Sequence, residues 1–273
     1  MKLVKTIAKI VVFVGVWAAA FYAASYFAVP WLEYRDAAPA TVEVCRGALA
    51  LLIAAVIACL AILIFDGRKG FPKLVKRPLR DALLGLFAGA FWVGVTFLLF
   101  TITDSIFPAG TSWPDFVSLW ALAVLLNVLT QELILRGFVY TAVARNYGAA
   151  AAIAVSSLVS LLAQGDAFEN GAVAVIFAVS AAALYGVMRQ YTGGLLAPVI
   201  THLIWNLVGG LAFGLVDLGG QFPKIFQEDI SGEDIISGGS AGFEGSVLSI
   251  IVCILLIDFV ILLGDGAKSR EDD

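Results

Sequence analysis

Residues 82–103 read ALLGLFAGAFWVGVTFLLFTIT, a run without one charged side chain. A transmembrane helix needs about 20 mostly apolar residues to cross a hydrocarbon core of about 30 Å, so this run predicts a membrane-spanning helix. The rest of the chain has the same character, because 61% of its 273 residues are hydrophobic and only 14% are charged. Soluble domains have roughly 45–50% apolar and about 25% charged residues. This composition excludes a soluble globular protein.

Seven further apolar runs have lengths suited to membrane spans. Three of them lack charged side chains and two are shorter runs of the same kind, whereas the last two are interrupted by Glu132 with Arg136 and by Asp258. We therefore predict an all-α fold, a polytopic membrane protein built as a bundle of about eight transmembrane helices, in one transmembrane domain over residues 1–273. The run nearest the amino terminus, 10–29, could alternatively be a signal peptide, although it is longer than the usual apolar core of a signal peptide. The runs, in the order described, are 10–29, 47–65, 193–216, 148–165, 171–188, 116–140 and 245–264.

The distribution of lysine and arginine predicts the orientation. Cytoplasmic loops carry the excess of basic residues, and if the amino terminus is inside, 13 of the 17 basic residues lie on the cytoplasmic side. The opposite side has Arg35 and Lys224, and its longest segment, 217–244, carries six acids against one lysine. We predict an integral protein of a bacterial-type plasma membrane with both termini cytoplasmic, and a flexible outer loop over 217–245. With a net charge of -4, the lipid bilayer is an expected partner and nucleic acid is not.

Two pairs of polar residues stand out inside predicted spans, where ionisable groups are costly and usually have a partner or a function. Glu132 and Arg136 are four residues apart, as are His202 and Asn206, so each pair shares one helix face. The simpler interpretations are a structural ion pair and a hydrogen-bonded core histidine, His202 being the single histidine of the chain. Glu132 and Gln164 are each sixteen residues from the turn at Gly148 and should lie at equal depth. We predict that these residues line an internal polar cavity that is entered from the cytoplasmic side.

Several short motifs in the second half of the chain occur together in a known family. They are QELILRGFVY (131–140), Tyr185-Gly186 with Arg189, YTGGLLAP (191–198) and His202-x-x-x-Asn206. In order and spacing they resemble the CAAX-protease and bacteriocin-processing family of intramembrane peptidases, of the Ras-converting type, over about residues 115–256. The resemblance implies an eight-helix bundle with an active site open to the cytoplasm. It also implies cleavage of membrane-associated peptides, either prenylated CAAX proteins or leader peptides, by a metal ion or a glutamate-activated water.

The match to the family's catalytic pattern is partial. Glu132, Arg136, His202 and Asn206 occupy family positions and are the catalytic candidates that the resemblance implies. Two catalytic positions are substituted, because Gln131 stands at the first glutamate, the family's presumed water-activating base, and Gln164 stands at the second-motif histidine. A glutamine amide cannot accept a proton near neutral pH. Catalytic zinc normally has three ligands from His, Cys and carboxylate, so the resemblance implies zinc with His202 as a ligand while the full ligand set is absent.

Three hypotheses about function remain open from the sequence. The chain could be an intramembrane endopeptidase of the CAAX type with impaired or altered catalysis, in which Glu132 acts as the base and His202 assists. It could be a non-catalytic pseudoprotease that binds a membrane-anchored peptide or protein, as a bacteriocin-immunity factor, adaptor or chaperone; Gln131 and Gln164 favour this. A transporter or channel is the third hypothesis, suggested by the polar residues Arg46, Asn127 and Asp258.

Overall fold

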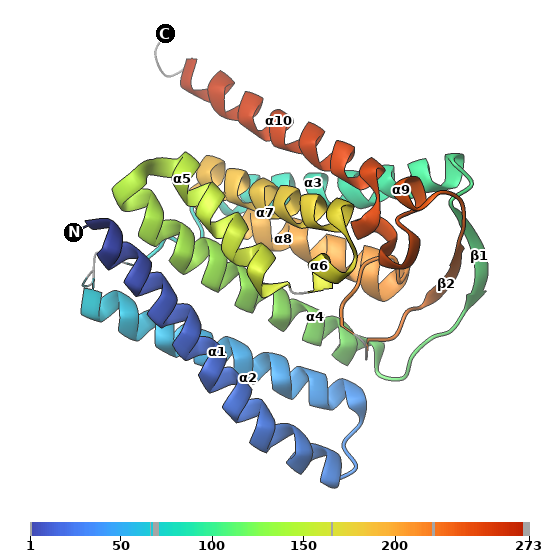
Figure 1. The fold of residues 1–273 in the computed structure, drawn as a ribbon, viewed down its shortest axis with the longest axis horizontal. Coiled ribbons are helices and arrows are strands. Elements are labelled where there is room, and N and C mark those ends of the chain that lie inside the picture. The colour runs from blue at the N-terminus through green and yellow to red at the C-terminus, as the bar shows by residue number, and fades with distance from the viewer. Residues whose placement is uncertain (1, 66, 68–70, 165, 220–221, 270–273) are drawn as a thin grey trace.

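The computed structural model describes residues 2–65, 67, 71–164, 166–219 and 222–269, and it is a bundle of helices (Figure 1). Arg68, Lys69, Gly165 and Arg270, which belong to predicted loops or spans, lie outside the described residues. The long helices are α1 (Lys2–Tyr34), α2 (Pro39–Phe65), α3 (Pro78–Ile102), α4 (Val117–Glu132), α5 (Tyr140–Ala163), α7 (Ala172–Thr192), α8 (Leu196–Ile204) and α10 (Val247–Ser269). Shorter elements are the π-helices η2 (Leu133–Val139) and η3 (Trp205–Ala212), α6 (Asp166–Glu169), α9 (Asp234–Ser237), the 3₁₀ helix η4 (Gly239–Gly245), and strands β1 (Ile106–Thr111) and β2 (Phe226–Ile230).

The predicted spans correspond to helices of the structure. Six helices in the described part of the chain are long and apolar enough to cross a membrane. One of them, Val117–Ala163, holds two of the predicted spans, which are separated by non-helical backbone at Gly148 with φ of 79°. This positive φ suits glycine, which has no Cβ to clash there. The predicted span 193–216 corresponds to a shorter apolar helix, Leu196–Ala212. The prediction of an all-α polytopic membrane protein is confirmed.

The segment 217–245, which we predicted to be a flexible outer loop, instead carries regular structure. Strand β2 pairs antiparallel with β1, and the chain continues into α9 and η4. The amide of Ser112 donates to the carbonyl of Ile225 at 2.8 Å, and the amide of Ser231 donates to that of Ser105 at 3.0 Å. These hydrogen bonds join the α3–α4 connection, which contains β1, to the η3–α9 connection, which contains β2. They satisfy backbone groups of both connections, which are far apart in sequence. Short strands with little apolar alternation give no clear sequence signal, which explains the difference.

The bundle has two distinct ends (Figure 1). Both chain termini lie at one end, which we call the terminal end. There the side-chain amide of Asn146 donates to the hydroxyl of Thr6 at 3.3 Å. The opposite end, which we call the strand end, carries β1 and β2. There the backbone amide of Asp217 donates to the carboxylate of Glu244 at 3.1 Å. Helices α3 and α10 run between the two ends, so a residue's place along them defines its depth.

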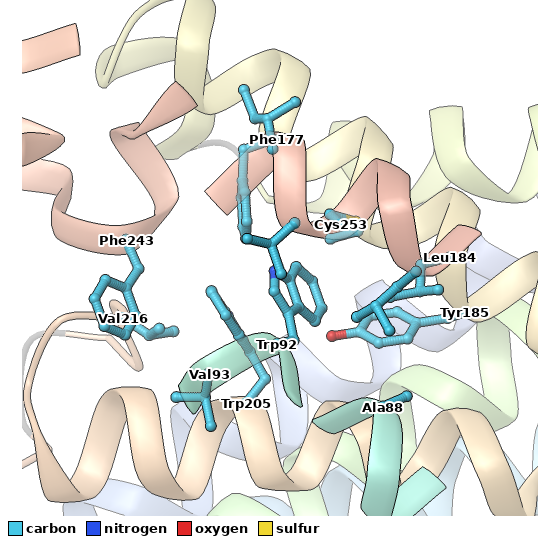
Figure 2. Close-up of a cluster of buried hydrophobic side chains, with 14 of the residues drawn as sticks. Ala88, Trp92, Val93, Phe177, Leu184, Tyr185, Trp205, Val216, Phe243 and Cys253 are labelled. Carbon is cyan, nitrogen blue, oxygen red and sulfur yellow. The ribbon is translucent and has the colours of Figure 1, made fainter. Parts of the chain in front are cut away.

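The largest core cluster surrounds Trp92 of α3 (Figure 2). The Trp92 ring stacks on that of Trp205 with centroids 4.1 Å apart, and its indole N–H donates to the carbonyl of Ser249 on α10 at 3.3 Å. Phe177 of α7 contacts both tryptophans. Buried aromatic pairs are worth about 0.5–1.5 kcal/mol beyond the area that they bury. This cluster therefore fixes α3, α7, α10 and the α8–η3 helix relative to one another.

Helix α8 packs closely on α3 because two glycines of α3 face it. A Cβ added to Gly85 would lie 2.8 Å from the Ala197 carbonyl oxygen, and one added to Gly89 would lie 2.8 Å from Ile204 Cβ. Glycines spaced four residues apart allow such close approach of helices in membranes. The hydroxyl of Thr201 donates to the carbonyl of Gly85 at 3.2 Å across this contact. The glycine face of α3 therefore helps set the position of α8.

We expect Gly89→Val to destabilise the protein by about 1–3 kcal/mol, the usual cost of overpacking a tight contact. The matched control is Gly94→Val on the same helix, since a Cβ at Gly94 meets nothing within 4 Å. That variant should stay within about 0.5 kcal/mol of the native protein. Thermal unfolding in detergent measures both. Equal melting temperatures for the two variants would contradict the proposed role of this contact.

Candidate functional site

A cluster of three buried side chains joins α4, η2 and α8. The carboxylate Oε1 of Glu132 accepts a hydrogen bond from Arg136 Nη1 at 3.2 Å and lies 3.0 Å from His202 Nδ1. The exposed fractions of the three residues are 0%, 1% and 6%. Glu132 ends α4, Arg136 lies in the π-helix η2, and His202 lies in α8 just before the π-helix η3. Single π-turns within helices occur frequently at functional sites.

Backbone and aromatic groups surround this cluster. Arg136 Nη2 donates to the carbonyl of Ala182 at 2.8 Å, and its guanidinium lies 5.1 Å from the centre of the Tyr185 ring. The Tyr185 ring stacks on His202 with centroids 4.7 Å apart at 16°. Glu132 Oε2 and Arg136 Nε have no hydrogen-bond partner among the described residues. Glu132 Oε1 thus contacts both the Arg136 guanidinium and the His202 imidazole.

A polar cavity of about 250 Å³ lies next to the cluster. His202 and Tyr185 belong to its lining, whereas Glu132 and Arg136 are not among the described lining residues. The predicted site residues Gln131, Gln164 and Asn206 do line it. The structure therefore brings together all six residues singled out from the sequence, with four facing the cavity and the Glu132–Arg136 pair behind it.

The amide side chains of the lining differ in their surroundings. Gln131 Nε2 donates to Asn127 Oδ1 at 3.1 Å, one turn earlier on α4. Gln164 directly follows α5, is exposed and lines the same cavity as Gln131. Glu132, which has the same spacing from Gly148 as Gln164, lies behind this lining. Asn206 is 8% exposed and lines the cavity. A side-chain amide that lines a cavity can donate hydrogen bonds to a ligand and accept them from it.

Asn127 and Tyr185 also line the cavity, although neither is among the site residues predicted from the sequence. Asn127 precedes Gln131 by one helical turn, so the i, i+4 spacing could have found it. Tyr185 lies within the motif 185–186, but only the structure shows its ring against both His202 and Arg136.

The remaining polar residues of the spans have other surroundings. Arg46 Nη1 lies 2.9 Å from Glu43 Oε1, one turn away on the same helix. Asp258 is exposed on the surface of α10.

Comparison with known proteins supports the resemblance seen in the motifs. Residues 113–208 match the family model described as type II CAAX prenyl endopeptidase Rce1-like. This region of the chain is therefore similar to the CAAX-protease family. No curated protein and no solved structure gives a significant match. The Rce1-like region contains the whole Glu132–Arg136–His202 cluster together with Gln131, Gln164 and Asn206.

The residues of the Rce1-like region do not fit the zinc site that the family resemblance implies. Glu132 and His202 are bonded to each other at 3.0 Å, and Glu132 Oε1 is also bonded to Arg136. Within the described ranges no group of three or more His, Cys, Asp or Glu side chains is placed to hold a metal ion. Zinc in proteins takes at least three such ligands. We therefore derive no catalytic step through a metal.

The cavity of the Rce1-like region opens at the strand end, contrary to the expectation from the sequence. Its exposed lining residues are Ala163, Gln164, Asn170, Asp217 and Gly219, whereas Tyr185, Trp205 and His202 are buried. The predicted cytoplasmic termini lie at the opposite end of the bundle. If the termini are cytoplasmic, the cavity does not open to the cytoplasm, so the two predictions cannot both be correct. The two predictions conflict because spacing along the chain gives relative depth but not the direction in which a cavity opens.

Proposed function

We propose that the chain is a CAAX-endopeptidase relative with impaired catalysis, whose polar cavity binds a membrane-associated peptide, prenylated or leader-like, without efficient hydrolysis. The observation that supports this most is the placement of the carboxylate. Glu132 lies behind the cavity lining, bonded to Arg136 and His202, while the lining itself presents Gln131 and Gln164. A general base must reach the water that it deprotonates, and an amide cannot replace it. Such a protein would act as an adaptor, chaperone or bacteriocin-immunity factor.

The chemistry of the cavity suits a peptide. Amide side chains both donate and accept hydrogen bonds, as peptide groups do, and Gln131, Gln164 and Asn206 all face the space. Phe177 and Trp205 provide an apolar wall. Ligand sites combine an apolar wall with a few convergent polar groups in volumes of about 300–1,000 Å³, and the cavity of about 250 Å³ is close to the lower end of that range.

A second candidate function, residual endopeptidase activity, is favoured by the contact between Glu132 and His202. A carboxylate at 3.0 Å from Nδ1 orients the imidazole and leaves Nε2 to act on a water in the cavity. Arg136 opposes this role, because it binds the same Glu132 Oε1 at 3.2 Å and competes with the imidazole for that oxygen. Peptide turnover that is lost in His202→Ala would support this second function.

Filling the cavity should abolish peptide binding. Ala178 is buried and lines the cavity, so we expect Ala178→Phe to weaken binding of a fluorescein-labelled farnesylated CAAX peptide at least tenfold, or about 1.4 kcal/mol. Fluorescence anisotropy with the purified full chain in detergent measures the binding. The control is Ala90→Phe at an exposed position of α3, which should bind like the native protein. Unchanged binding by Ala178→Phe, or no saturable binding by the native protein, would contradict the proposal.

A further inference from the structure

We propose that the outward face of α10 is a docking surface for a transmembrane helix of another protein, and that this helix carries a lysine or arginine that pairs with Asp258 inside the bilayer. Asp258 lies outside the Rce1-like region 113–208 and is not among the lining residues of the cavity. Such docking is therefore separate from the peptide binding proposed above. The orientation of Asp258, its depth and the pattern of residues around it support this assignment.

Asp258 lies on the side of α10 that points away from the bundle. Figure 1 shows α10 at the edge of the bundle. The buried side of α10 belongs to the core cluster around Trp92 and includes Cys253, Leu256 and Val260. With about 3.6 residues per turn, Asp258 is nearly opposite these residues, and it is exposed. Since this helix is long and apolar enough to span a membrane, its exposed side faces lipid. The carboxylate of Asp258 thus points toward hydrocarbon.

Packing against α3 places Asp258 well inside the spanning part of the bundle. The ring of the next residue, Phe259, lies 5.4 Å from the ring of Phe87. Helix α3 covers Pro78–Ile102, so Phe87 is about 14 Å from its first residue at a rise of about 1.5 Å per residue, close to the middle of the helix. An ionisable side chain at such depth is costly and almost always has a partner.

The described part of the chain provides no hydrogen bond and no ion pair to Asp258. Arg80 lies near α10, but its guanidinium is held by Asp81 at 2.9 Å and by the ring of Tyr191 at 4.9 Å. Tyr191 meets α10 at Gly264, six residues beyond Asp258, which is about 9 Å along the helix. A basic side chain of another protein would compensate the carboxylate, whereas a second copy of α10 would bring a like charge against it.

The residues around Asp258 have the spacing of a contact between two helices. Ile251, Leu255, Asp258 and Leu262 follow one another at intervals of four, three and four residues, and all four are exposed. Apolar residues at alternating intervals of three and four line the contact of paired helices, and a single polar residue among them specifies the register and the partner. The outward face of α10 therefore combines an apolar stripe with one charged group that selects a basic partner.

Disulfide cross-linking in proteoliposomes tests the proposal with a defined helix. The full chain carries Cys45→Ala and Cys59→Ala, keeps the buried Cys253, and receives one cysteine by Leu262→Cys. The probe is a synthetic membrane-spanning polyleucine peptide with a central lysine and a cysteine four residues to either side of it, so that both directions of the peptide can react. The control peptide has leucine in place of the lysine. After oxidation we expect about fivefold more cross-linked product with the lysine peptide than with the leucine peptide.

Two variants show whether Asp258 and α10 are responsible. Asp258→Leu in the same background should reduce the yield with the lysine peptide to that with the leucine peptide. Leu98→Cys in place of Leu262→Cys puts the cysteine at an exposed position of α3 and should give equally low yields with both peptides. Equal yields of the two peptides at Leu262→Cys would overturn the proposal. Cross-linking of Leu262→Cys to a second copy of the chain, lost in Asp258→Leu, would also overturn it.

Discussion

Arg136→Met should destabilise the bundle by about 3–5 kcal/mol, the usual cost of removing one partner of a buried ion pair. Arg136 is 1% exposed and bonds both Glu132 and the carbonyl of Ala182. Methionine fills a similar volume but leaves the carboxylate of Glu132 with His202 as its remaining bonded partner among the described residues. Thermal and denaturant unfolding in detergent should therefore show a large loss of stability.

Two control variants separate the loss of a charge from the loss of a buried partner. Arg46→Met removes a guanidinium that is 35% exposed from its ion pair with the buried Glu43. It should cost less than Arg136→Met, because water reaches the Arg46 side of this pair. The double variant Glu132→Leu with Arg136→Met removes both charges and should recover part of the stability lost in Arg136→Met. Equal losses for Arg136→Met and Arg46→Met would show that the buried cluster is not a special contributor to stability.

The double variant Gln131→Glu with Gln164→His should hydrolyse peptides that the native protein does not. Both side chains line the cavity beside His202, so the substitutions place a carboxylate and a second imidazole where a bound peptide and water meet. A positioned general base contributes about 10²–10⁴-fold to rate, and we expect a gain within this range over the native background. A quenched fluorescent farnesylated CAAX peptide, with the purified full chain in detergent, provides the measurement.

Matched variants identify the source of any gained activity. Asn127 already bonds Gln131 through its side chain, and the Asn127 amide can turn to donate to a glutamate at position 131. His202→Ala in the double-variant background should remove the gained activity, whereas Ala90→Phe in the same background should retain it. If the double variant remains as inactive as the native protein while it still binds the peptide, the two glutamines are not what impairs catalysis.

The sequence predicts much of the architecture because the bilayer imposes a simple rule. Long uncharged runs such as 82–103 must be helices when lipid surrounds them, since the backbone can satisfy its hydrogen bonds only internally. Sequence spacing also associates Glu132 with Arg136, and His202 with Asn206, because residues four apart share a helix face. These local rules do not depend on tertiary structure.

Features that depend on contacts between distant segments could not be predicted in this way. The bond between Glu132 and His202 joins residues seventy positions apart, and the pairing of β1 with β2 joins segments that are separated by several helices. The close approach of α8 to α3 at Gly85 and Gly89 likewise requires both helices to be in place. The direction of the cavity mouth follows from such contacts, which is why the sequence predicted entry from the wrong end relative to the termini.

The most direct test of peptide binding without efficient hydrolysis is the turnover of a bound peptide by the native protein. Labelled farnesylated CAAX peptide is bound to saturation, as followed by anisotropy, and the same samples are analysed for cleavage products by mass spectrometry. We predict saturable binding with the peptide intact, because the one carboxylate of the cluster lies behind the cavity lining. Cleavage by the native protein at a rate typical of enzymes, about 1–1,000 per second, would contradict this prediction.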